Sequence, residues 1–317
     1  MTPLTPLQVQ TIHSIVNIYE TGAVLGVYSQ VTLIKGDTGG LTYGRSQTTL
    51  MSGNLAKLIE AYLENAGSEA SFDLKAYLPR IRAKDETLNT DPFFANLLRA
   101  AADQPVMRQA QDRFFDSAYW DPAHQTWLSM GGQSALGAAI TYDSWVHGSF
   151  ALIRKRTDEA LGGSLGSVGE KTWMKTYVST RKSWLAENPN TALHATVYRM
   201  NAFEEMIAAE NWDLALPMTV RGQTISVASL AAEPPGVFDG PQVGYRTLVA
   251  AKPWPRGCDV RQVQTALSKP EHGGADLIAD GIYGPGSAKA VQAFQSSAGL
   301  SKDGHVGEKT YKALGLL

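Results

Sequence analysis

The stretch that decides the fold is IYETGAVLGVYSQVTLIKGDTGGLTYGRSQ, residues 18–47. A segment with apolar residues at helical spacing, residues 7–20, stops near Gly22 and places Glu20 in its last turn. Residues 28–34, rich in β-branched side chains, predict a strand that leads into a glycine-rich turn containing Asp37. The two carboxylates are therefore either unrelated surface groups or the two sides of a cleft.

Composition and charge exclude several classes of protein. The chain has 317 residues, of which 44% are hydrophobic, and this length suits one large domain and a small one. A net charge of -2 without a basic stripe argues against nucleic acid, and no apolar run approaches the ~20 residues that span a bilayer. The single cysteine, Cys258, excludes an internal disulfide framework, and the histidines form no zinc motif. We expect no metal, no cofactor, no membrane insertion and a monomer.

Most of the remaining chain predicts helices. Pro92 and Pro105 mark two helix starts, because proline at the first helical position loses no hydrogen bond. A short β-hairpin is predicted at residues 218–226, with its turn at Arg221 and Gly222. Helices are predicted at residues 7–20, 48–66, 74–88, 92–102, 105–119, 122–130, 133–146, 149–161, 170–187 and 190–209.

The composition changes after residue 230. Residues 231–254 are dense in proline and glycine without periodicity, which predicts a linker or an extended strap along the surface. We therefore expect a catalytic domain at residues 1–230, a linker at 231–254 and a small helical domain at 255–317.

The last part of the chain contains a doubled turn. The sequences DGIYG, residues 280–284, and DGHVG, residues 303–307, are each followed by a helix, at 287–297 and 309–314. This pattern resembles the peptidoglycan-binding domain type 1, a three-helix module. The resemblance rests on Gln264, Asp280, Gly284, Ala290, Phe294, Gln295, Gly299, Leu300, Asp303, Gly304, Gly307 and Thr310. It implies binding to wall polysaccharide without chemistry, so removing residues 251–317 should weaken wall binding more than cleavage of short oligomers.

The amino-terminal sequence, MTPLTPLQVQTIHSIVNIYE, lacks the cationic start, apolar core and cleavage site of a signal peptide. We therefore expect synthesis in the cytoplasm and action on the cell wall or in the periplasm. Release by a phage holin or delivery by a secretion system would carry the protein there.

The chemistry of glycoside hydrolysis suits the two acids of the opening stretch. Such a reaction needs one carboxylic acid to protonate the leaving oxygen and a second carboxylate as base or nucleophile. Glu20 ends an apolar helix, whereas the backbone N–H groups of the glycine turn can keep Asp37 ionised. The hydroxyl of Thr42 can position a water molecule.

This arrangement resembles the chitosanases of glycoside hydrolase family 46, which have a lysozyme-like, mostly α fold. The resemblance extends to FDSAYWDPA (115–123), AAITYDSWVHGS (138–149), TRKSWL (180–185) and YRMNAFEEMI (198–207). It implies Glu20 as general acid, Asp37 as general base and Thr42 as partner of the attacking water. It also implies inversion, with the carboxylates ~6.5–9.5 Å or more apart. Asp143, Arg181 and Arg199 correspond to a network that supports the acid.

We expect a mainly α protein: a lysozyme-like α+β domain with a small β-sheet, followed by a three-helix wall-binding domain. Tyr28 and Tyr43 are candidates for stacking on sugars, and Arg45 for contacting substrate. Chitosan is polycationic, and a net charge of -2 gives it little attraction. The sequence therefore favours a muramidase of the endolysin type, cleaving β-1,4 linkages of peptidoglycan. A chitosanase, a lytic transglycosylase and a non-enzymatic wall-binding protein remain alternatives.

Overall fold

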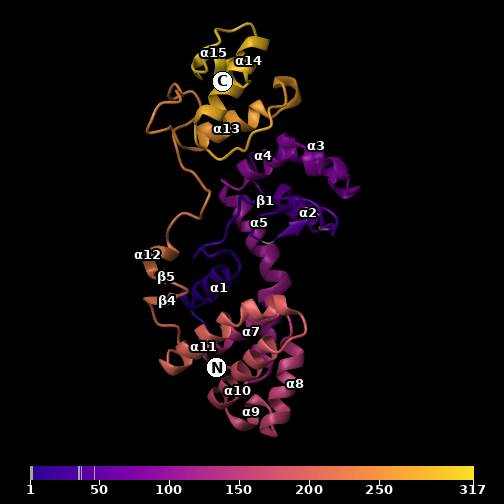
Figure 1. Cartoon of the computed structure of the whole chain (residues 1–317), viewed down its shortest axis with the longest axis vertical. Coiled ribbons are helices and arrows are strands. Elements are labelled where there is room, and N and C mark those ends of the chain that lie inside the picture. The colour runs from indigo at the N-terminus through magenta and orange to yellow at the C-terminus, as the bar shows by residue number, and fades with distance from the viewer. Residues whose placement is uncertain (1–2, 35, 37, 46) are drawn as a thin grey trace. The chain divides into compact units, whose positions relative to one another are not determined.

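The computed structural model describes residues 3–34, 36, 38–45 and 47–317 of the chain (Figure 1). Its elements pack into two units. Unit 1 comprises Met1–Gly26 and Phe115–Glu233, and unit 2 comprises Val27–Phe114 and Pro234–Leu317. The three predicted parts are consecutive segments of the chain, whereas each of the two units is built from two segments that are separate in sequence. The predicted mainly α architecture with small sheets is confirmed.

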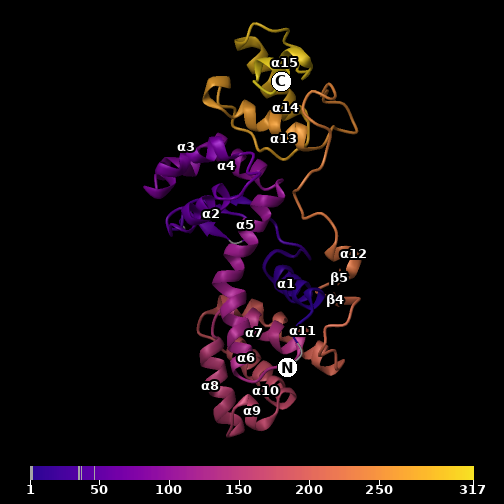
Figure 2. The ribbon, with the colours of Figure 1, turned by 180° about the vertical axis from the view of Figure 1, so that it is seen from behind.

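Unit 1 is helical, with one short hairpin (Figure 2). Its elements are α1 (Pro6–Thr21), η2 (Asp116–Trp120), α6 (Asp121–Ser129), α7 (Ala135–His147), α8 (Phe150–Leu161), α9 (Leu165–Val168), α10 (Glu170–Ala186), η3 (Thr191–Thr196), α11 (Tyr198–Ala208), β4 (Met218–Val220), β5 (Gln223–Ile225) and α12 (Val227–Leu230). The hairpin turns at Arg221 and Gly222, both with positive φ, as predicted.

Helix α7 forms the centre of unit 1, where it packs against α1, α6, α8 and α10. It is buried on every side from Ala135 to Ser144, because small residues let neighbouring helices approach closely. Gly137 faces the ring of Trp127, and a Cβ at this position would lie 2.3 Å from Trp127 Cζ2. Only glycine therefore fits there, and this close packing fixes the helix that carries Asp143.

The first part of unit 2 is a small sheet covered by helices. The antiparallel strands β1 (Val31–Thr32), β2 (Thr42–Tyr43) and β3 (Thr48–Thr49) lie in that order. The paired residues are Val31 with Tyr43, Thr32 with Thr42, Thr42 with Thr49, and Tyr43 with Thr48. The helices are α2 (Asn54–Leu63), α3 (Ser71–Arg82), η1 (Glu86–Thr90), α4 (Pro92–Ala101) and α5 (Pro105–Phe115).

Five predicted elements have wrong bounds. The strand at 28–34 is reduced to β1, and the helix at 48–66 begins only at Asn54, because its first two threonines pair with β2. Gly53 has φ +81°, which a continuous helix cannot accommodate. The segments 74–88 and 190–209 each divide into an α-helix and a 3₁₀ helix, and 105–119 ends in a π-helical turn.

The carboxyl-terminal module of unit 2 consists of α13 (Cys258–Leu267), η4 (Pro270–His272), α14 (Pro285–Ser297) and α15 (Glu308–Ala313). Two buried glutamines explain the doubled turn. Gln264 Nε2 donates to Asp280 Oδ1 at 2.8 Å, and Gln264 Oε1 accepts from the backbone N–H of Gly281 at 2.9 Å. Gln295 makes the same two bonds to the second turn, at 2.8 and 2.9 Å. The sequence repeat is therefore a repeat of one hydrogen-bonded unit.

The proline- and glycine-rich segment packs as a strap on this module. Leu248 is fully buried, and its backbone exchanges two hydrogen bonds with Val306, at 3.0 and 3.1 Å. Arg246 binds both carboxylate oxygens of the buried Asp259, at 2.8 and 3.0 Å. The sequence left open whether this segment is a linker or an extended strap. These contacts favour a strap for the part around residue 248.

Candidate active site

Glu20 lies in the last turn of α1 because local signals fix both ends of this helix. Thr5 and Gln8 form a capping box at its start, and Gly22 ends it with φ +75°. The Glu20 side chain is 42% exposed, and its Oε1 accepts a hydrogen bond from Arg199 Nη2 at 2.7 Å. One carboxylate oxygen is thus held by a guanidinium while the side chain stays accessible to solvent.

Behind Glu20 lies the Arg–Asp–Arg network, formed by Arg199 on α11, Asp143 on α7 and Arg181 on α10. Asp143 Oδ1 accepts from Arg199 Nη1 and Asp143 Oδ2 from Arg181 Nη1, both at 2.8 Å. Asp143 and Arg181 are fully buried, and Arg199 is 4% exposed. The structure therefore brings together the four charged residues that the sequence singled out in unit 1.

Electrostatics keeps Arg199 charged. Burial disfavours its charge, but the carboxylates of Asp143 and Glu20 outweigh this effect and raise the pKa of Arg199 above its usual value. Its guanidinium carbon also lies 5.3 Å from the ring centre of Tyr19, and the Tyr198 hydroxyl donates to the Tyr19 carbonyl at 3.0 Å. The cation beside Glu20 is thus fixed from several sides.

His147 extends the network and was not among the predicted site residues. Its Nδ1 lies 3.1 Å from Arg181 Nη2, and a guanidinium can only donate, so Nδ1 accepts and the imidazole is neutral. Burial, followed by the positive charges of Arg199 and Arg181, lowers the pKa of His147 to about 4. The signal available in the sequence was its position four residues after Asp143 on the same helix.

In unit 2 the predicted base, Asp37, lies outside the described residues. Thr42 is buried in β2, and its hydroxyl donates to the Gly40 carbonyl over 3.4 Å, which is long for such a bond. The roles of both residues, and the separation of the two carboxylates, stay predictions.

The three predicted substrate-binding residues form hydrogen bonds to other residues of unit 2. Tyr43 is fully buried, and its hydroxyl donates to the Leu98 carbonyl at 2.7 Å, so its ring offers no surface to a sugar. The hydroxyl of Tyr28 donates to Asp112 Oδ1 at 2.8 Å, and Arg45 Nη1 donates to the same oxygen at 2.7 Å. These contacts give Tyr28, Tyr43 and Arg45 structural functions. For Tyr43 they argue against a contact with substrate.

Gln111 on α5 holds the turn that follows Thr42, and sequence reasoning missed it. Its Oε1 accepts from the Arg45 backbone N–H at 2.8 Å, and its Nε2 donates to the Tyr28 carbonyl at 3.1 Å. Gly44 packs directly against this amide, because a Cβ on Gly44 would lie 2.1 Å from Gln111 Oε1. A glutamine inside a predicted helix carries no local signal of such a contact.

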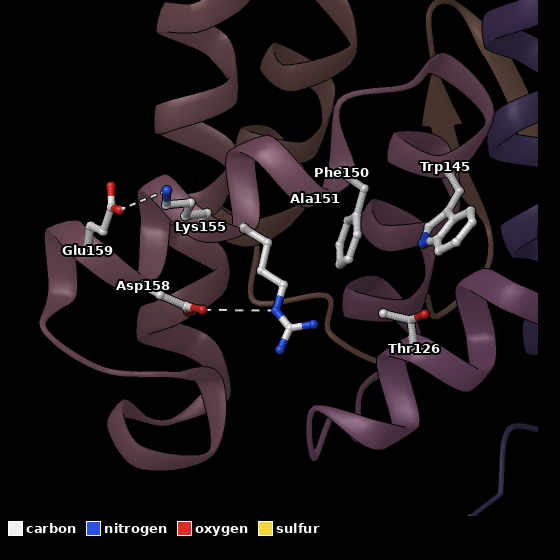
Figure 3. Close-up of a pocket in the computed structure, with 8 residues that line it drawn as sticks. Thr126, Trp145, Phe150, Ala151, Lys155, Asp158 and Glu159 are labelled. Carbon is white, nitrogen blue, oxygen red and sulfur yellow. Dashed lines mark ion pairs between the residues drawn. The ribbon is translucent and has the colours of Figure 1, made fainter.

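One cavity of about 500 Å³ in unit 1 is separate from the predicted residues. It is lined by the aromatic residues Trp145 and Phe150 and by two ion pairs, Arg154 with Asp158 and Lys155 with Glu159 (Figure 3). Neither Glu20 nor the Arg–Asp–Arg network lines this cavity. It is therefore not the candidate active site.

Within the described residues, no group of three or more histidine, cysteine, aspartate or glutamate side chains is arranged to hold a metal ion. In the same part of the chain, no helix combines the length and apolar character needed to cross a membrane.

Residues 14–218 match the model of glycosyl hydrolase family 46. The chain belongs to this family. The chitosanase of Bacillus subtilis strain 168 is 30% identical to it over 224 residues, which cover 65% of this chain and 78% of the relative. Native chitosanase from Bacillus subtilis MY002 has a TM-score of 0.57 at 28% identity, covering 69% of this chain and 96% of that chain. A glutamate-to-alanine variant of chitosanase from the same strain, complexed with 6 GlcN, also has a TM-score of 0.57, at 26% identity and with the same coverage of both chains. The predictions of a lysozyme-like fold and a glycosidase are confirmed.

The carboxyl-terminal module also has known relatives. Residues 256–314 match the model of the putative peptidoglycan binding domain. The N-acetylmuramoyl-L-alanine amidase XlyB of Bacillus subtilis strain 168 is 37% identical over 92 residues, which cover 28% of this chain and 26% of that protein. The chain thus combines a glycoside hydrolase domain with a wall-binding module, and its partner is a polysaccharide.

Proposed function

We propose that this protein is a chitosanase, which hydrolyses β-1,4 linkages between glucosamine units and is brought to cell walls by its carboxyl-terminal module. The observation that carries the proposal is Glu20, held at 2.7 Å by Arg199 at the accessible end of α1 within a family 46 domain. The family relatives named as chitosanases favour chitosan over the peptidoglycan substrate that the net charge suggested.

In the proposed mechanism, protonated Glu20 gives its proton to the leaving glycosidic oxygen. Asp37 takes a proton from a water molecule that Thr42 positions, and this water attacks the anomeric carbon from the opposite face with inversion. As the bond breaks, negative charge develops on Glu20 and the Arg199 guanidinium stabilises it. Asp143 keeps the guanidinium oriented, because it binds the other terminal nitrogen, Nη1, of the same group.

A second candidate is a muramidase that cleaves peptidoglycan glycan strands. The wall-binding module favours it, because that module would place the enzyme on peptidoglycan. Both candidates use the same acid and base and differ only in the sugar polymer that is cleaved.

Mass spectrometry of products from chitosan oligomers and from purified peptidoglycan distinguishes these candidates. We expect shortened glucosamine oligomers from chitosan and no soluble muropeptides from peptidoglycan. The opposite pattern would support the muramidase, and 1,6-anhydro products would indicate a lytic transglycosylase. Glu20→Gln should abolish cleavage, whereas the matched control Glu204→Gln, at an exposed ion pair on α11, should not. Full activity of Glu20→Gln would refute the assigned acid.

A further inference from the structure

In unit 2 the wall-binding module packs on helix α4 through a fully buried asparagine, Asn96. The Asn96 Nδ2 group donates to Ser268 Oγ and, at 2.8 Å, to the Leu277 carbonyl. Its Oδ1 accepts from the Ala279 backbone N–H at 3.0 Å and from Arg99 Nη1 at 2.8 Å. All four bonds of one side chain are therefore used, and three of them go to the module.

A buried ion pair lies beside Asn96. Arg261 on α13 is 2% exposed, and its Nη1 lies 2.5 Å from Asp103 Oδ1, just after α4. The same Nη1 donates to the Arg99 carbonyl at 3.2 Å, and Nη2 donates to the Gly236 carbonyl in the strap. A buried charge of this kind is costly unless its partners are in place. The ion pair therefore favours one arrangement of the module on α4.

These contacts reach the sheet through Arg99. Arg261 of the module donates to the backbone carbonyl of Arg99 at 3.2 Å, and Asn96, the α4 residue that makes three bonds to the module, accepts from Arg99 Nη1 at 2.8 Å. Arg99 Nη2 donates to the Val31 carbonyl over 3.5 Å, a long hydrogen bond, and α4 packs against β1 beside it. Strand β1 pairs with β2, which contains Thr42.

We propose that the wall-binding module positions the β1–β2 strand pair through Asn96 and Arg99, and that it is thereby a working part of the catalytic domain. The proposal rests on the proposed function, in which Thr42 and the segment that follows β1 serve the water side of the reaction. Asn96 and Arg99 are positioning residues and touch no substrate. The module then determines the turnover of soluble oligomers as well as wall affinity.

This inference reverses an expectation drawn from the sequence. For a tethered module, removal should weaken wall binding more than it slows the cleavage of short oligomers. Here its removal would take three of the four bonds from the buried amide of Asn96, leave Asp103 without Arg261, and free the Arg99 carbonyl from Arg261.

The test uses the full-length chain with Asn96→Asp. This change keeps the side-chain shape and the two accepted bonds, but it places a carboxylate oxygen against the Leu277 carbonyl. We expect kcat on a chitosan hexamer to fall about tenfold or more with KM changed less than about twofold, because a small displacement of catalytic groups reduces turnover. Binding to purified sacculi should stay unchanged. The matched control is Asn190→Asp, the same chemical change at an exposed helix cap, where aspartate caps equally well.

Hydrogen exchange of the backbone amides in β1 and β2 gives a readout that does not depend on substrate. Asn96→Asp should speed exchange there, and Asn190→Asp should not. If the wild-type chain fails to cleave chitosan, the proposed function is refuted. The exchange rates in β1 and β2 still test whether the module positions these strands. Should Asn96→Asp not fold, Ser268→Ala should give a smaller effect in the same direction, because it removes one of the two acceptors of Asn96 Nδ2 together with the hydroxyl's bond to the Gln264 carbonyl. Unchanged kcat and unchanged exchange in a folded variant would overturn the proposal.

Discussion

Replacing Asp143 by asparagine removes a negative charge from the centre of the Arg–Asp–Arg network and keeps the shape of the side chain. In the wild-type protein Asp143 is fully buried and binds two buried guanidiniums, those of Arg181 and Arg199, at 2.8 Å each. Asparagine has one acceptor oxygen, so its NH₂ group would face the N–H groups of one arginine. Two buried cations would then remain without a counter-charge between them.

The expected loss of stability is large. Removing one partner from a buried ion pair costs about 3–5 kcal/mol. For a domain of about 150 residues or more, each kcal/mol lowers Tm by about 2–4 °C, so Asp143→Asn should lower Tm by about 10 °C. Cleavage of chitosan should also fall, because Arg199 loses the contact that orients it toward Glu20.

Tryptophan fluorescence during thermal or urea unfolding measures this effect in the right part of the protein, because every tryptophan except Trp254 lies in unit 1. Glu204→Gln is the matched control. It removes a carboxylate that joins α10 and α11 through Lys182, at 2.6 Å, but the two side chains are 40% and 38% exposed. Such a surface pair contributes about 0–1 kcal/mol. Equal Tm losses in Asp143→Asn and Glu204→Gln would refute the reasoning.

Three further outcomes are expected. The pKa of His147 is about 4 in the folded protein and 6.5 in the unfolded chain, so the folded state binds fewer protons between these pH values. The contribution of His147 to the free energy of unfolding is therefore fully present above pH 6.5, and up to about 3 kcal/mol is lost as the pH falls through 4. Urea midpoints measured against pH should therefore fall less in His147→Asn than in wild type. Gly44→Ala should cost about 2 kcal/mol or more and reduce cleavage, since its φ is +67° and its Cβ would overlap Gln111; an unchanged urea midpoint would contradict this. Tyr43→Phe should lose about 1 kcal/mol, from the bond to Leu98, and keep its KM for chitosan; a raised KM would restore Tyr43 as a substrate contact.

Local signals were sufficient to predict the end of α1. The capping residues and Gly22 lie within a few residues of the helix they delimit, so Glu20 was placed correctly in the last turn. The start of α2 shows the opposite case, because Thr48 and Thr49 have helical neighbours in sequence but pair with β2. Pairing with another strand overrides local preference, and a single sequence does not reveal it.

Contacts between distant segments set the limit for the site. The link between Arg199 and Glu20 joins residues 179 positions apart, and only the family resemblance indicated it. Tyr43 beside a glycine turn suggested an exposed aromatic ring, yet the Leu98 carbonyl, 55 positions away, binds its hydroxyl in the core. Asn96, bound to a residue 172 positions away, had no sequence signal, because asparagine in a helix usually faces solvent.

The network in unit 1 and the contacts of Asn96 in unit 2 follow the same physical rule. In each case a fully buried polar side chain, Asp143 or Asn96, uses its hydrogen-bonding capacity on partners from distant segments. An unsatisfied buried group costs about 1–3 kcal/mol or more, so small displacements of these partners are strongly opposed. Asp143 fixes the guanidinium of Arg199, which holds Glu20, and Asn96 fixes the side chain of Arg99, which contacts β1. Under the proposed coupling, a buried contact between the module and α4 supports the β1–β2 strand pair, so a change at Asn96 lowers turnover even where the wall affinity of the module is unchanged.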